Sequence, residues 1–109
     1  MGEAEKAYGE ALALYRDLAA RNPDAYRPDV AMTLNNLAIL YKDTQRLGEA
    51  EKAYDEALAI RREFTLRDRR AFGPKLANTL RGIASIYRLT NRKAEADAAS
   101  REAEISDAQ

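Results

Sequence analysis

Hydrophobic residues recur along the chain at the spacing of helix faces. Between residues 30 and 41 they stand three or four positions apart, at Val30, Leu34, Leu37, Ala38 and Tyr41. A second stretch of this kind runs from about residue 47 to 64, and no stretch alternates Val, Ile or Thr with polar residues as a strand would. The pattern predicts an all-α protein of five antiparallel helices, near residues 3–20, 29–43, 47–65, 75–89 and 93–106.

Turn-forming residues separate these segments. Pro28 suits the first turn of a helix, where its missing N–H costs nothing, and Asp29 favours the positive end of the helix dipole. We expect breaks at 22–24 and 44–46, and a long linker over 66–74 with a corner at 72–74.

The chain repeats itself with a period of 46 residues. At this offset 27 of the 63 aligned pairs are identical, and residues 3–8 return unchanged as residues 49–54. Self-similarity at a fixed period is the signature of a repeat architecture. We therefore interpret residues 1–109 as a single domain of about two and a half units: a half repeat 3–28, a full repeat 29–74 and a C-terminal capping repeat 75–106.

The central unit resembles a tetratricopeptide repeat. The resemblance rests on large, small and aromatic residues at fixed spacings, namely Leu34, Leu37, Ala38 and Tyr41, then Ala50, Tyr54 and Ala57. The string from residue 29 to 41 is similar to the long-repeat subclass typified by kinesin light chain. The resemblance implies a right-handed solenoid of helical hairpins that binds proteins or peptides, with the first helix of each unit lining a concave groove.

Composition excludes several classes of function. The chain has no Cys and no His, so thiol chemistry, the commonest general base and the commonest transition-metal ligand are missing. Neighbouring carboxylates on a helix point away from one another, and no Gly-rich phosphate loop or nucleophile motif occurs. We predict no enzymatic activity, no cofactor and no metal site.

The groove stripe of each unit can be read opposite its core positions. In the full repeat it comprises Met32, Asn35, Ile39 and Lys42, with Asn36 at the edge, and in the capping repeat Asn78, Arg81, Ser85 and Arg88. Groove asparagines resemble those that bind peptide main chain in this family, while arginine forks suit carboxylates. The alternative is that the asparagines hold helices together and the arginines only solvate an exposed face.

Charge is segregated although its sum is zero. Residues 61–93 carry ten basic and two acidic residues, while the segments on both sides are acidic. Such a block would steer an acidic ligand toward this end of the groove. Nucleic acid is not predicted, because no nucleic-acid-binding motif occurs and the segments that flank the basic block are acidic. A run of solvated cations is the simpler interpretation.

The first helix has no preceding partner helix in the sequence. It carries Tyr8, Leu12, Tyr15 and Leu18, which would form an open self-association face unless they pack against helix 29–43 alone. The last helix, by contrast, is rich in Ala and polar residues, as the end of a solenoid requires.

Two functional hypotheses follow. The first is a protein-interaction module that binds an extended, acidic peptide in the groove. The alternative is a structural module that forms a homo-oligomer through the first helix, and near-identical units would also suit an engineered scaffold. No apolar run is long enough for a membrane span or a signal peptide, so no membrane partner and a cytoplasmic location are expected by default.

Overall fold

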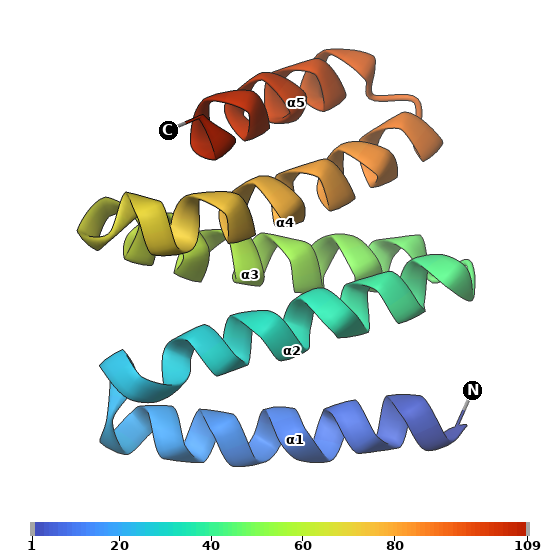
Figure 1. Cartoon of the computed structure of the whole chain (residues 1–109). Coiled ribbons are helices and arrows are strands. Elements are labelled where there is room, and N and C mark those ends of the chain that lie inside the picture. Colours follow the sequence, from blue (N-terminus) through green and yellow to red (C-terminus); the bar gives the residue numbers. More distant parts are fainter. Residues whose placement is uncertain (1, 109) are drawn as a thin grey trace.

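The chain folds into five α-helices stacked in chain order. The computed structural model describes residues 2–108, in which the helices are α1 (Gly2–Arg21), α2 (Pro23–Asp43), α3 (Leu47–Arg67), α4 (Arg69–Leu89) and α5 (Lys93–Asp107). Each helix packs against the next, and α2 also touches α4 directly (Figure 1). The predicted all-α solenoid of helical hairpins is thus confirmed, and residues 2–108 contain no strand.

Two helices begin earlier than predicted. α2 begins at Pro23 and α4 at Arg69, so the predicted linker over 66–74 is wrong. The side chain of Asn22 accepts a hydrogen bond from the Ala25 N–H, and Asp68 accepts one from the Ala71 N–H at 3.1 Å. Because of these N-caps, each helix begins several residues before its inner proline, Pro28 or Pro74. The proline removes only one backbone hydrogen bond from the helix.

The two turns inside the hairpins share one geometry. Gln45 and Asn91, one repeat apart, both adopt a left-handed backbone with φ near 60° (63° and 62°). The following N–H groups of Arg46 and Arg92 each donate to the carbonyl of a tyrosine, at 2.7 Å. Each arginine also lies over the ring of that tyrosine, Tyr41 or Tyr87. The turn and its cation–π contact therefore repeat with the sequence.

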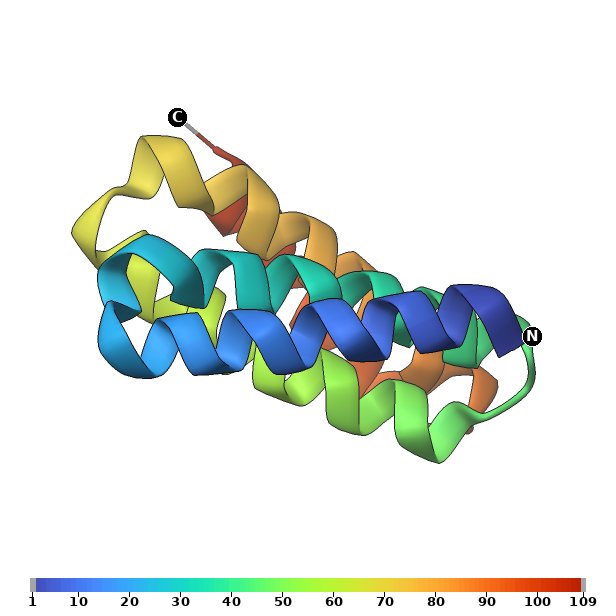
Figure 2. The same ribbon diagram turned by 90° about the horizontal axis from the view of Figure 1, so that it is seen from below.

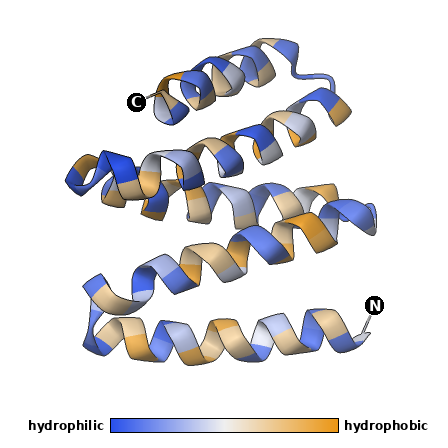
Figure 3. Cartoon of the chain, in the orientation of Figure 1, coloured by the Kyte–Doolittle hydropathy of each residue, from blue (hydrophilic) through white to orange (hydrophobic). Residues whose placement is uncertain are grey.

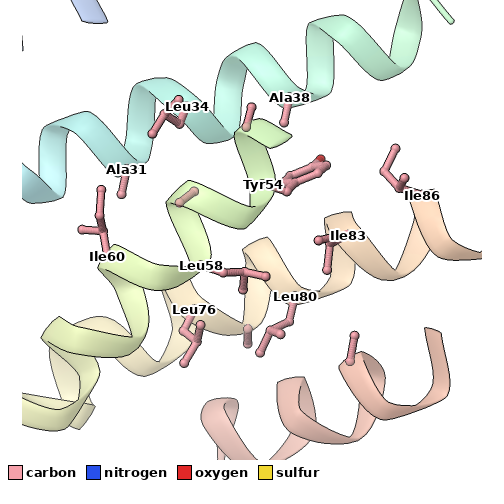
Figure 4. Close-up of a cluster of buried hydrophobic side chains, with 14 of the residues drawn as sticks. Ala31, Leu34, Ala38, Tyr54, Leu58, Ile60, Leu76, Leu80, Ile83 and Ile86 are labelled. Carbon is pink, nitrogen blue, oxygen red and sulfur yellow. The ribbon is translucent and has the colours of Figure 1, made fainter. Parts of the chain in front are cut away.

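The core lies where α3 fits between α2 and α4. Tyr54 projects from α3 between Ala38 of α2 and Ile83 of α4, all of them buried (Figure 4). Gly82 makes this approach possible, because a Cβ at that position would lie 2.6 Å from the Tyr54 ring. The burial of large apolar side chains here, about 1.5–3 kcal/mol each, fixes the three helices relative to one another.

Ion pairs link the second helices of successive units. Arg16 of α1 pairs with Glu56 of α3, and Arg62 of α3 pairs with Glu102 of α5 in the same way. Figure 2 shows α1 running lengthwise alongside α2 at one side of the stack. None of the helices within residues 2–108 combines the length and the apolar character needed to cross a bilayer.

Candidate functional site

The face shared by α2 and α4 carries exposed apolar residues. Met32 and Ile39, two turns apart on α2, are 43% and 42% exposed. Asn78 and Ser85 hold the equivalent positions on α4. Lys42 of α2 reaches across, with its Nζ 3.3 Å from the Ser85 Oγ. These five predicted groove residues, which we call the α2–α4 face, therefore lie on one surface.

A pocket opens at the N-terminal end of this face. It has a volume of about 130 Å³ and lies between α2 and α4 over the side of α3. Its lining residues are Pro28, Asp29, Met32, Ile60, Arg61, Phe64, Phe72 and Lys75. Figure 4 shows Ile60 projecting from α3 toward α2. The pocket thus combines apolar walls with three charged groups.

Arg61 lines the pocket and is only 7% exposed. Its Nη1 donates to the Thr79 Oγ1 at 2.6 Å and to the Lys75 carbonyl at 3.1 Å. Burial lowers the pKa of the guanidinium, which nevertheless stays charged at neutral pH because arginine titrates so high. Sequence reasoning placed Arg61 only in the basic block, since nothing local marks it as buried.

Asn35 is not an exposed groove residue. It is 6% exposed, and its Oδ1 accepts a hydrogen bond from the Thr79 Oγ1 at 3.0 Å. Asn36 is half-buried and corresponds to Gly82, which faces the second helix of the preceding unit. Asn35 therefore joins α2 to α4, as in the alternative interpretation of the groove asparagines.

Arg81 and Arg88 point toward α5 rather than across the α2–α4 face. The Nη2 of Arg81 lies 3.1 Å from Asp107, and the Nη2 of Arg88 donates to the Ser100 Oγ at 3.0 Å. Together with Ser100 and Glu104 they line a separate hollow between α4 and α5. The nine predicted groove residues thus fall into two separate surfaces and a buried contact.

Ion pairs offset much of the basic block. Four of its ten cations pair with carboxylates, namely Arg62, Arg67, Arg81 and Arg92. Arg69 instead donates to the carbonyl of Ile105. In the part of the chain that the structure describes, the cations left at the α2–α4 face are Lys42, Arg61 and Lys75. The positive potential on this face is therefore local rather than a continuous basic surface.

The outer face of α1 exposes an apolar residue whose equivalent in α3 is buried. Leu14 is 58% exposed, whereas Ile60, its equivalent one repeat later, is 4% exposed. Among the predicted self-association residues, Leu12 and Tyr15 pack against the core, and Tyr8 and Leu18 are half-buried. Leu14 is the most exposed large apolar residue of α1, and comparison of the two units identifies it.

Across residues 2–108 no group of three or more Asp and Glu side chains is placed to hold a metal ion. Several carboxylates on the helix surfaces, such as Glu56 and Glu102, are paired with arginines.

A family model matches part of the chain. Residues 30–63 match the model described as tetratricopeptide repeat. The match runs from Val30 of α2 through most of α3, and this is the unit whose residues carry the sequence resemblance. It supports a relationship to the tetratricopeptide repeat family. Repeats of this family are typically non-enzymatic and mediate protein–protein interactions. No curated protein matches the sequence.

Proposed function

We propose that the chain binds an extended peptide across the α2–α4 face, in the manner of the long-repeat subclass that residues 29–41 resemble. The observation that carries the proposal is the pair Met32 and Ile39, large apolar side chains left exposed beside a pocket. Contiguous exposed apolar surface with polar neighbours is typical of interaction sites.

The face offers a distinct contact for each part of a peptide. Met32 and Ile39 would pack against apolar side chains, and the adaptable thioether of Met32 suits varied partners. Asn78 is exposed and carries both a donor and an acceptor, so it can pair with extended main chain. Lys42 and Lys75 would attract acidic residues of the same peptide.

Introducing charges on the exposed apolar residues tests this face. Peptides are selected from a random display library on the intact chain, and their affinities are measured for a Met32→Glu/Ile39→Glu variant by calorimetry. We expect binding to weaken at least tenfold, because two exposed anchors are replaced by charges while the core is untouched. The matched control is Leu89→Glu, an exposed leucine of α4 outside this face. Equal affinity for all three proteins would refute the assignment.

A second candidate function is self-association through α1. Its support is the contrast between exposed Leu14 and buried Ile60 at equivalent repeat positions. Figure 3 shows hydrophobic residues along the whole length of α1. Two copies meeting through this same face would form a closed, two-fold dimer.

Light scattering across a concentration range tests the second candidate. A dimer of the 12.2 kDa chain should become a monomer with Leu14→Lys. Leu66→Lys, which alters an even more exposed leucine at the end of α3, should leave the dimer intact. A monomeric wild-type protein at all concentrations would reject self-association and leave the peptide proposal standing.

A further inference from the structure

The open side of α1 is a copy of a side that is covered on α3. Residues 3–8 of α1 are identical to residues 49–54 of α3, and residues 10–13 are identical to residues 56–59. Within residues 2–108, α3 packs between α2 and α4, whereas α1 packs closely only against α2 (Figure 1). The chain itself therefore shows which kind of helix covers this side.

The apolar part of this side is exposed on α1. It consists of positions 4, 7, 11 and 14, which are three or four residues apart and so share one side of the helix. Ala4 and Ala7 are exposed, and Leu14 is 58% exposed. In the α2–α3 hairpin the equivalent residues are at most 7% exposed, namely Ala50, Ala53, Ala57 and Ile60. The small residues would let another helix approach α1 as closely as α2 approaches α3.

A row of carboxylates runs along the edge of this apolar stripe. Glu3, Glu10 and Asp17 are spaced seven residues apart, and all three are exposed. On α3 each equivalent carboxylate binds an arginine, in the pairs Glu49–Arg46, Glu56–Arg16 and Glu63–Arg27. Within residues 2–108, Glu3 and Glu10 form no ion pair, and Asp17 pairs only inside its own helix. α1 thus keeps the acidic edge but lacks the arginines that neutralise it on α3.

Two of these three arginines belong to the segment that forms α2. Arg27 lies in the first turns of α2, and Arg46 follows the turn at its end. Each lies 2.7 Å from its carboxylate, at opposite ends of the antiparallel α2–α3 pair. A helix that covers α1 in the same way needs a positive charge near each of its ends, to meet Asp17 and Glu3.

We propose that α1 binds an amphipathic helix of a partner protein, antiparallel to itself. The partner helix has small and apolar residues along one side, as α2 does, and an arginine near each end. The acidic edge is the reason to favour it over a second copy, because two copies of α1 would place acidic edges on both sides of the contact. The inference does not depend on peptide binding at the α2–α4 face.

A synthetic peptide of residues 22–46, the α2 peptide, is the probe. It includes the helix cap Asn22 and both arginines, and its binding to the intact chain is measured by fluorescence anisotropy at low salt, where exposed charges are least screened. We expect saturable binding of one peptide per chain, with NMR shifts at the amides of residues 7–14. Reversing both charges of the peptide, Arg27→Glu/Arg46→Glu, should weaken binding about tenfold.

Variants of the chain test whether the peptide meets the acidic edge of α1. Glu3→Lys/Asp17→Lys should weaken binding of the α2 peptide about tenfold and restore it for the charge-reversed peptide, which a merely structural effect would not do. Asp97→Lys/Glu104→Lys is the matched control, since it reverses two exposed carboxylates of α5 and should leave binding unchanged. Leu14→Lys should abolish binding, because it places a charge in the apolar stripe.

Three results would overturn the proposal. The first is no saturable binding, or binding that is insensitive to both charge reversals. The second is a set of shifts spread over α3, which would mean that the peptide displaces α2 instead of covering α1. The third is a dimer of the chain that the α2 peptide does not dissociate, because a second copy would then occupy this side of α1. None of these results would bear on peptides bound at the α2–α4 face, so the two proposals fail separately.

Discussion

A chain of three buried polar side chains joins the central helices. Asn35 of α2 accepts from Thr79 of α4, which in turn accepts from Arg61 of α3. The sequence alone could not reveal this network. Its members are 18 and 44 positions apart, and the sequence pattern placed Asn35 in the groove stripe opposite the core, whereas α4 covers it. What the sequence did predict at this scale are the small and aromatic core residues, such as Ala38 and Tyr54.

Thr79→Val should destabilise the fold by about 1–3 kcal/mol, because the partner groups on Asn35 and Arg61 lose a hydrogen bond while buried. Thr33 is the matched control, since it occupies the equivalent buried position one repeat earlier but bonds only to the Asp29 carbonyl of its own helix. Thr33→Val should cost less than about 1 kcal/mol. Urea unfolding measures both, and equal costs would contradict the network.

Gly82→Ala should also destabilise the chain, by about 1 kcal/mol or more. The new Cβ would meet the buried Tyr54 ring, and the strain of over-packing exceeds the usual gain from replacing a helical glycine. A Cβ added at Gly9 of α1 would meet no neighbouring atom, so Gly9→Ala should stabilise the chain by about 0.5–1 kcal/mol. Opposite signs in thermal unfolding are the expected result, and a stabilising Gly82→Ala would contradict the close approach of α3 and α4.

At the scale of helices, the periodic pattern predicted how many there are and their order but not where two of them begin. Proline was read as the start of a helix, whereas Pro28 and Pro74 lie inside α2 and α4. A proline is tolerated there because the carbonyl groups that it leaves unbonded belong to the exposed residues Asp24 and Arg70. The true starts depend on side-chain caps, which single residues provide and which periodicity does not detect.

Asp68→Ala should therefore loosen the first turns of α4 and cost about 0.5–2 kcal/mol. Hydrogen exchange of the amides of residues 72, 73 and 75 should accelerate, because the cap no longer holds the helix start. Arg70→Ala, an exposed change in the same turn, serves as the control. Unchanged protection at these amides would indicate that α4 begins nearer residue 75, as the sequence pattern suggested.

Across the whole molecule, ion pairs repeat with the sequence period. Arg46 pairs with Glu5 and Glu49, and one unit later Arg92 pairs with Glu51 and Glu95. The repeat itself could be predicted from the sequence, as could the opposite charges. The pairs with Glu5 and Glu51 could not, because these carboxylates lie 41 positions away in the preceding unit and meet the arginines only in the folded stack.

These pairs predict a loss of stability in acid. Hydrogen bonds from Arg46 hold the pKa of Glu5 and Glu49 below the ordinary value of 4.5, and Arg16 does the same for Glu56. Their stabilisation is complete above that value and is lost as the pH falls through the lowered pKa values. Asp55 acts in the opposite sense, since burial raises its pKa. Melting temperatures of the wild type and Glu56→Gln should differ at neutral pH and converge in acid, whereas a constant difference would contradict the pairing.

The peptide-binding proposal depends on where a partner lies on this stack. The most direct test is an NMR footprint of a library-selected peptide on the intact chain. The proposal predicts amide shifts at Met32, Ile39, Asn78 and Ser85, on the face shared by α2 and α4. Shifts confined to α1, or to Arg81, Arg88 and α5, would contradict it.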